Sequence, residues 1–236
     1  MHWTPPPKPA ELTEHRLLQA ILDGQFPIDS NLPAERELAA LLGVTRPTLR
    51  ETLQRLARDG WLEIRHGKPT RVRNYWVEGN LAVLAHIARR QDHLPQDFIP
   101  NLLSIRCLLA PAYTRLAIHN DAESIAQLLA TYPDLADTPE AYTQADWELH
   151  RSLTIASRNP VFTLILNGFC ELYAIMGKRY FALPAARAYS QQFYQKLLDC
   201  ARQADEDAAE TLTRQVMAES MRFWQQVSQS SLPKEI

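Results

Sequence analysis

Glycine is scarce in this chain, and this scarcity limits the possible folds more than any other feature of the sequence. The chain holds 7 glycines among 236 residues, whereas an average composition would give about 16. Tight turns and phosphate-binding loops depend on glycine because it adopts left-handed backbone conformations without steric cost. Neither the G-x-G-x-x-G nor the G-x-x-x-x-G-K-[ST] signature of nucleotide-binding enzymes occurs. We therefore expect a mostly α-helical protein.

The spacing of apolar residues predicts three helices and then a β-hairpin in the N-terminal part of the chain. Helical spacing runs over 10–23, 33–42 and 46–58. Apolar and polar residues alternate over 61–65, and a second strand is predicted over 70–76, with a turn between them. The predicted helix ends are Gly24, Gly43 and Gly60.

From residue 81 onward no strand pattern occurs, and the spacing is helical throughout. The predicted helical windows are 80–90, 96–119, 122–131, 139–157, 160–181, 185–203 and 206–229. Pro100 and Pro111 fall inside the second window, so we expect that helix to start late or to bend. The predicted organisation is a domain of three helices and a β-hairpin over 1–77, a linker over 78–80 and an all-α helical bundle over 81–236.

The net charge of −2 conceals an asymmetry along the chain. Residues 1–76 carry a net charge of +2, and residues 77–236 carry −4. Within the first part, residues 34–76 hold nine basic and five acidic side chains, a local net charge of +4. A basic segment joined to an acidic one is typical of a polyanion-binding module attached to a second domain.

Several other classes of protein are excluded by simpler features. A membrane-spanning helix needs a run of about 18 apolar residues, and none occurs. The N-terminus lacks the basic-then-apolar order of a signal peptide. Cys107, Cys170 and Cys200 are too few and too scattered for a disulfide scaffold or a thiolate metal site. We therefore expect a cytoplasmic protein without a membrane partner.

Residues 34–53 have the pattern of a helix-turn-helix. Ala39 is small where the two helices would cross, Gly43 supplies the turn, and Leu49 anchors the second helix to the first. The second helix would then be a recognition helix, whose N-terminal residues enter the major groove of DNA.

Five side chains of this motif are candidates for contacting DNA. Arg46 and Arg50 are four residues apart and therefore share one helix face. Arginine can donate two hydrogen bonds to O6 and N7 of guanine, which makes it suited to reading a base. Thr45 and Thr48 lie beside the N-terminal end of that face, and Arg36 precedes it on the other helix, where it can reach a phosphate or a base.

The hairpin that follows the helices predicts the wing of a winged helix. Its tip, His66-Gly67-Lys68, is small and basic. Glycine lets the backbone approach the minor groove, and His66 and Lys68 can reach in beside it. A plain turn residue without a DNA contact is the alternative interpretation of His66.

At this point the sequence resembles a known family. Residues 32–62 read L-P-A-E-R-E-L-A-A-L-L-G-V-T-R-P-T-L-R-E-T-L-Q-R-L-A-R-D-G-W-L, which resembles the GntR family of bacterial transcription regulators. I-R-H-G-K-P-T-R-V-R-N-Y-W, N-L-L-S-I-R, N-P-V-F-T-L-I-L-N-G and L-Y-A-I-M-G-K-R-Y-F-A resemble, more narrowly, its FadR subfamily. The resemblance covers essentially the whole chain beyond the first ten residues.

The resemblance implies a homodimer whose two winged helices read a palindromic operator. It also implies a helical effector domain that binds long-chain acyl-CoA and then releases the DNA. Regulators of this kind repress fatty-acid degradation genes and activate unsaturated fatty-acid synthesis genes. No enzymatic activity and no cofactor are expected. Pro47 replaces a threonine of the subfamily, so one hydroxyl contact to DNA is lost here.

Four residues match the ligand-binding positions of the subfamily: Arg106, Tyr180, Ser220 and Trp224. Arg106 stands out because it lies in an otherwise apolar helix. The candidate residues for an acyl channel are Phe162, Leu166, Phe169 and Leu172. The last helix has Val216 and Met217 where the subfamily carries tyrosine and glycine, so Met217 could fill space that the ligand needs.

An alternative effector is a small carboxylate bound with the help of a metal. Relatives in the wider superfamily hold a metal with one aspartate and three histidines, and the Asp146–His150 pair has the spacing of the first two. Tyr194 and Ala218 stand at the other two positions. We therefore favour a hydrogen-bonded Asp–His pair that lines a pocket without a metal.

Overall fold

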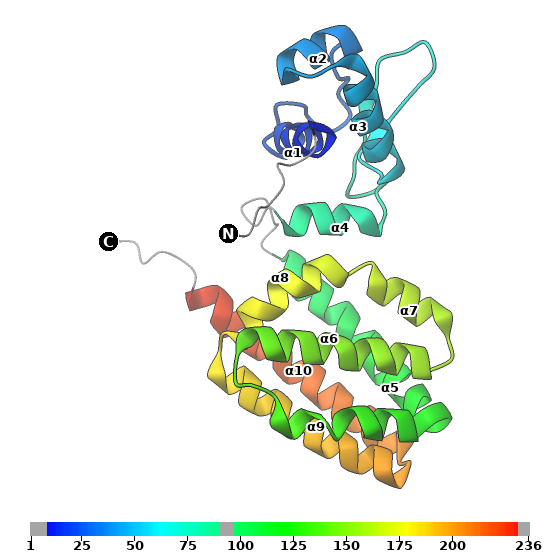
Figure 1. The fold of residues 1–236 in the computed structure, drawn as a ribbon, viewed down its shortest axis with the longest axis vertical. Coiled ribbons are helices and arrows are strands. Elements are labelled where there is room, and N and C mark those ends of the chain that lie inside the picture. The colour runs from blue at the N-terminus through cyan, green and yellow to red at the C-terminus, as the bar shows by residue number, and fades with distance from the viewer. Residues whose placement is uncertain (1–8, 90–96, 231–236) are drawn as a thin grey trace, which may run out of the picture. The chain divides into compact units, whose positions relative to one another are not determined.

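The computed structural model describes residues 9–89 and 97–230 and divides the chain into two compact units, residues 1–94 and residues 95–236 (Figure 1). The N-terminal unit combines helices with a small sheet, and the C-terminal unit is helical in its described part. This agrees with the predicted fold class, a winged helix-turn-helix followed by an all-α bundle. Each unit is considered by itself below.

The N-terminal unit contains four described helices and a two-stranded antiparallel sheet. Its elements are α1 (Pro9–Leu22), α2 (Glu35–Leu42), α3 (Arg46–Arg58), β1 (Leu62–Glu63), β2 (Arg71–Val72) and α4 (Leu81–Ala88). In the sheet Leu62 pairs with Val72 and Glu63 with Arg71. The strands are shorter than the predicted 61–65 and 70–76. After Arg73 the chain turns, and the amides of Val77 and Glu78 donate to the carbonyl of Asn74.

A segment before α2 extends this small sheet. Asn31 forms an isolated antiparallel bridge with Arg71. The amide of Leu32 donates to the carbonyl of Thr70 at 2.8 Å, and the amide of Val72 donates to that of Ser30 at 2.8 Å. The chain that enters α2 is therefore joined by backbone hydrogen bonds to the strand that leaves the wing.

The turn of the helix-turn-helix depends on a glycine and on a threonine cap. Gly43 ends α2 at φ 68°, a left-handed conformation that is strained for other residues. Thr45 is extended, and its hydroxyl accepts a hydrogen bond from the amide of Thr48 at 3.4 Å, which caps α3. Gly43 is confirmed as the end of α2, and the Thr45 cap marks the start of α3.

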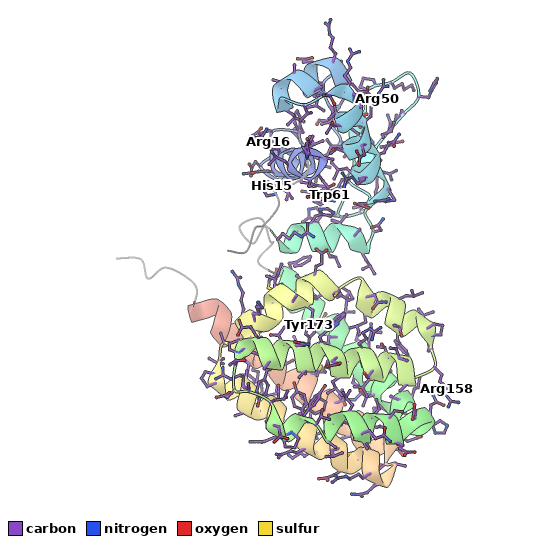
Figure 2. All side chains as sticks on the ribbon, in the orientation of Figure 1. His15, Arg16, Arg50, Trp61, Arg158 and Tyr173 are labelled. Carbon is purple, nitrogen blue, oxygen red and sulfur yellow. The ribbon has the colours of Figure 1, made fainter. Side chains whose placement is uncertain are left out.

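Trp61 lies at the centre of the N-terminal core and is fully buried. Its ring centroid is 4.6 Å from that of Tyr75 and 6.1 Å from that of His86, so the tryptophan touches both the wing base and α4 (Figure 2). Val83 and Ile87 of α4 are buried in the same core. Helix α4 therefore packs with the DNA-binding unit, whereas the sequence-based division at residue 80 assigned it to the effector domain. From the sequence, the apolar face of α4 could pack on either unit. In the structure it packs on the core of the N-terminal unit.

The base of the wing is held by one arginine. Arg71 of β2 forms ion pairs with Glu63 at 2.8 Å and with Glu78 at 2.8 Å, and it also bonds Asp29. Hydrogen bonds from Arg65 and Arg71 lower the pKa of Glu63 to about 2. These carboxylates come from three separate segments, so Arg71 ties the wing to the body of the unit.

The C-terminal unit is an all-α bundle over its described residues. Its elements are α5 (Phe98–Leu129), a 3₁₀ turn η2 (Tyr132–Asp134), α6 (Pro139–Ala156), α7 (Pro160–Asn167), α8 (Cys170–Phe181), α9 (Pro184–Gln203) and α10 (Glu206–Ser230). Three of these helices begin at a proline, where the missing N–H has no helical partner to lose. The bundle matches most predicted windows.

Three of the predicted windows differ from the structure. The windows 96–119 and 122–131 are joined in α5, which is kinked at Asp121 but continues through Pro111. The window 160–181 is divided into α7 and α8, which are bent by 68° at their junction. Among the described residues no single helix is long and apolar enough to cross a membrane, and α7 with α8 reaches that length and hydropathy only as a bent pair.

Helix α5 runs through the bundle and packs against α6, α9 and α10 (Figure 1). Ala110, Ala117 and Leu149 are fully buried at these contacts. Small residues on α5 let the neighbouring helices approach closely. The arrangement leaves the N-terminal half of α5 beside α7 and α8, where the cavity described below lies.

We expect the substitution Trp61→Ala to lower the free energy of unfolding of the N-terminal unit by about 3–5 kcal/mol, because it removes a fully buried aromatic side chain. Native-state hydrogen exchange of the amides in α3 and β1 measures this loss directly. The matched control is Trp76→Ala, since Trp76 is 45% exposed and should cost no more than about 1 kcal/mol. Equal losses in the two variants would contradict the assignment of Trp61 to the core.

Candidate DNA-binding surface and effector cavity

The residues predicted to contact DNA lie on the surface of the N-terminal unit. Arg36 projects from α2, and Arg46 and Arg50 project from the first two turns of α3, all three with exposed side chains. Thr45 is exposed and Thr48 is half-buried, and their hydroxyls are 2.9 Å apart. The arrangement offers cationic and hydroxyl groups at one end of α3, as a recognition helix requires.

Arg50 has a partner that the sequence analysis did not foresee. Its Nε donates to Oε2 of Glu35 at 2.7 Å, which links α3 to the first turn of α2 (Figure 2). The two residues are 15 positions apart in the chain, so no helical spacing connects them. Only the packing of α2 on α3 brings them together.

The tip of the wing matches its prediction in position and exposure. His66, Gly67 and Lys68 are all exposed. Gly67 has φ 69°, and no atom lies within 4 Å of the place a Cβ would take. The amide of Lys68 donates to the carbonyl of Arg65 at 3.3 Å and closes the turn. Contacts of these residues with DNA stay a prediction.

The C-terminal unit contains a cavity that collects all four residues predicted to bind the ligand. Arg106 comes from α5, Tyr180 from α8, and Ser220 and Trp224 from α10. The cavity has a volume of about 120 Å³ and is partly open to solvent. The residues named as a candidate acyl channel, Phe162, Leu166, Phe169 and Leu172, also line it. Most of the wall is apolar, and the polar groups gather around Arg106.

Arg106 is held by a network of hydrogen bonds. Its Nη2 donates to Oδ2 of Asp146 at 2.9 Å and lies 2.6 Å from Nε2 of His150. The guanidinium also lies over the ring of Tyr173, 5.5 Å from the centroid. Asp146 accepts a further hydrogen bond from the Tyr173 hydroxyl on α8 (Figure 2). An arginine in an apolar helix is therefore explained by carboxylate and imidazole partners on α6.

His150 is neutral in this network. Burial, together with the positive charge of Arg106, lowers the pKa of His150 to about 3. Because a guanidinium can only donate, Nε2 of His150 must accept from Arg106. Nδ1 then carries the proton and lies 2.7 Å from the Tyr113 hydroxyl.

Asp146 remains ionised although it is buried. Burial by itself raises the pKa of the Asp146 carboxyl, but the interactions with His150 and Arg106 and two tyrosine hydrogen bonds outweigh it and leave that pKa below its usual value. The second tyrosine is Tyr194 of α9, whose hydroxyl donates to Oδ1 at 2.9 Å. The cavity thus has one charged end, made of Arg106 and Asp146.

Tyr113 and Tyr173 were missed by the sequence analysis. Tyr113 is two helical turns after Arg106, so a seven-residue spacing on one helix face was the available signal. Tyr173 lies on α8, and nothing in its local sequence connects it to Asp146. Asp146 and His150 do line the cavity as expected, but their side chains are 3.8 Å apart at Oδ2 and Nε2 and meet through Arg106.

The described residues do not fit a metal at this place. They contain no group of three or more histidine, cysteine, aspartate or glutamate side chains that could hold an ion. The Arg106 guanidinium takes the Nε2 lone pair of His150 and one oxygen of Asp146, which are the atoms a metal would need. A cation of the protein itself stands between these two ligands.

The two departures from the subfamily have different surroundings. Val216 and Met217 are buried in the bundle core and are not among the residues that line the cavity. The expectation that Met217 fills ligand space is therefore not supported by its position. Pro47 lies in the first turn of α3, where its ring is tolerated.

Two family models match this chain, one in each part of it. Residues 9–72 match the model of the family described as bacterial regulatory proteins, gntR family. Residues 73–236 match the FadR C-terminal domain. The two models meet inside the unit to which α4 belongs by packing.

Curated relatives match over nearly the full length. The fatty acid metabolism regulator protein of Cronobacter sakazakii is 41% identical over 228 residues, which cover 97% of this chain and 95% of the relative. That of Erwinia tasmaniensis is 43% identical over 229 residues with the same two coverages.

A solved structure supports the fold. It is described by the words "Lar controls the expression of the Listeria monocytogenes agr system and mediates virulence". It matches with a TM-score of 0.64 and 16% identity, over 96% of this chain and 99% of that one. The full-length relatives and the two domain matches lead to one conclusion. The chain belongs to the GntR family of DNA-binding transcription regulators and, within it, to the group of fatty acid metabolism regulators that carry the FadR C-terminal domain.

Proposed function

We propose that the protein is a homodimeric regulator that binds a palindromic operator and leaves it when long-chain acyl-CoA fills the cavity of the helical unit. In this role it represses fatty-acid degradation genes and activates unsaturated fatty-acid synthesis genes. The observation that carries the proposal is the cavity. Most of its lining residues are apolar, Arg106 and Asp146 make part of the lining charged, and all four matching residues line it: Arg106, Tyr180, Ser220 and Trp224.

The chemistry of the cavity supports an amphiphilic ligand. An acyl chain gains free energy by leaving water for the apolar wall, at about 25 cal/mol for each Å² of apolar surface buried. The polar part of the same molecule would need hydrogen-bond donors, and Arg106 retains N–H groups beyond those bound to Asp146 and His150. A thioester with a long chain satisfies both requirements.

The surface of the N-terminal unit supports sequence-specific binding to DNA. Arg46 and Arg50 are exposed at the start of α3 and can donate two hydrogen bonds each to a guanine. Lys68 at the wing tip and Arg36 on α2 add positive charge for phosphates. Two copies of this surface related by a twofold axis would read a palindrome.

The alternative effector, a small carboxylate held through a metal, has less support. Arg106 already occupies the metal-binding atoms of Asp146 and His150. A small anion would also interact mainly with the charged residues, whereas most of the residues that line the cavity are apolar.

The release of DNA is tested with a duplex selected from random-sequence DNA by the wild-type protein. We expect oleoyl-CoA to abolish the shifted band in a gel-shift titration, while free CoA does not. Undiminished binding at saturating oleoyl-CoA would rule out the proposed effector. Failure to select any sequence would rule out the proposed DNA function as well.

Tyr180→Phe should raise the oleoyl-CoA concentration needed for half release by about two- to tenfold, because the variant lacks one hydroxyl hydrogen bond to the ligand. Tyr189→Phe is the matched control, since Tyr189 is half-buried in the same unit but does not line the cavity. Both variants should bind the selected duplex as the wild type does without ligand. An equal shift in both would contradict a role of Tyr180 in binding.

Arg50→Ala should weaken binding to the selected duplex by about 1–3 kcal/mol and relax the preference for one base pair of each half-site. Arg58→Ala is the control, because Arg58 is exposed near the C-terminal end of α3, where it pairs with Asp59. It should weaken binding to selected and random duplexes alike. The same uniform loss in Arg50→Ala would refute base reading by Arg50.

Lys68→Ala should reduce the slope of log K against log salt concentration by about 1, because one phosphate contact is removed. Lys178→Ala, which removes an exposed lysine of the helical unit, should leave the slope unchanged. Fluorescence anisotropy of the selected duplex at several salt concentrations measures both slopes. An unchanged slope for Lys68→Ala would remove the wing tip from the DNA interface.

A further inference from the structure

The ion pair between α2 and α3 joins a predicted base-reading residue to an acidic side chain. Nε of Arg50 donates to Oε2 of Glu35 at 2.7 Å, and the two side chains are 65% and 41% exposed. The position of Glu35 is set by packing. One turn later on α2, Leu38 and Ala39 are buried in the core with Leu49 of α3. The carboxylate is therefore presented to α3 by a rigid helix crossing.

The geometry of the hydrogen bond determines which part of Arg50 stays available. A guanidinium carries five N–H donors, one on Nε and two on each Nη. Glu35 engages Nε and leaves the four N–H groups of Nη1 and Nη2. Those two nitrogens form one edge of the planar fork, which is the edge that can donate to O6 and N7 of a guanine together.

We propose that Glu35 is a positioning residue for base reading: its carboxylate holds the Arg50 fork by Nε so that Nη1 and Nη2 face one guanine of the operator. This inference rests on the proposed DNA function. A free arginine side chain loses considerable rotamer entropy when it is fixed on a base. Glu35 fixes part of that side chain before DNA arrives. Exclusion of water in the complex lowers the local dielectric and strengthens the ion pair.

Glu37 provides a matched control within the same helix turn. Both acids lie in the first turn of α2, where the helix dipole stabilises a negative charge. Both are at the surface, but no ion pair of Glu37 is seen within the described residues, whereas Glu35 bonds Arg50. Removal of either charge lessens the repulsion of phosphates. Only removal of Glu35 frees the Arg50 fork.

The experiment measures affinities of the full-length protein for two duplexes by fluorescence anisotropy. One is the duplex selected from random-sequence DNA by the wild type, and the other is a random duplex of equal length. We expect Glu35→Ala to lower the ratio of the two affinities by about two- to fivefold, the range expected for one exposed ion pair. Glu37→Ala should leave that ratio unchanged, and circular dichroism verifies that both variants are folded.

A double-mutant cycle shows whether Glu35 acts through Arg50. In an Arg50→Ala background, Glu35→Ala should have no further effect on the ratio. Single base-pair replacements should lose their effect at the same guanine in Glu35→Ala and in Arg50→Ala. A ratio unchanged by Glu35→Ala, or an effect that persists without Arg50, overturns the inference alone. A wild-type protein that binds both duplexes equally overturns the proposed DNA function and this inference with it.

Discussion

Arg106 and Asp146 bring opposite charges to one end of a cavity whose other walls are mostly apolar. Ions buried in this way lose their hydration, and only an opposite charge and well-placed hydrogen bonds offset that loss. Asp146 receives hydrogen bonds from Arg106, Tyr173 and Tyr194, which come from three different helices. The pair therefore joins α5, α6, α8 and α9 around the cavity. An apolar side chain in place of either residue would leave the other charge buried without a partner. The pair therefore keeps part of the cavity lining polar.

The same chemistry occurs at the surface of the other unit with a different consequence. Arg50 is held by Glu35, but both side chains are partly exposed to solvent, so the pair adds little to stability. We propose that the pair acts instead by orienting the guanidinium. In both units an arginine is fixed by a carboxylate through some of its N–H groups while others remain free. In the helical unit the fixed cation, Arg106, lines the cavity, and on α3 the fixed cation, Arg50, is exposed to solvent.

Much of the N-terminal unit could be predicted because its signals are local. Gly43 and Thr45 act on the backbone within two or three residues, and the helix-turn-helix follows from them. The predicted strands were too long because the alternation of apolar and polar residues does not show where the hydrogen-bonded ladder ends. Outside the ladder, Glu78 accepts a hydrogen bond from the amide of Asn74. Assignment of α4 to the bundle was the larger difference. The apolar face of an amphipathic helix indicates that the helix packs on another element but does not identify that element. In the structure Val83 and Ile87 of α4 pack with Trp61.

By itself the sequence determined the helical class, the winged helix-turn-helix, the four cavity residues on α5, α8 and α10, and the exposure of the basic residues on α3. These follow from periodicity, from capping and from matching motifs, which act over a few residues or are carried by the family. Only the tertiary structure decided that Arg106 stands between Asp146 and His150, that Tyr113 and Tyr173 belong to the same network, and that Glu35 holds Arg50. Each of these contacts joins two separate helices. Which side chains meet in these contacts depends on how the helices cross. The pattern of apolar residues on a helix predicts which face is buried, but not which side chains of another helix that face will contact.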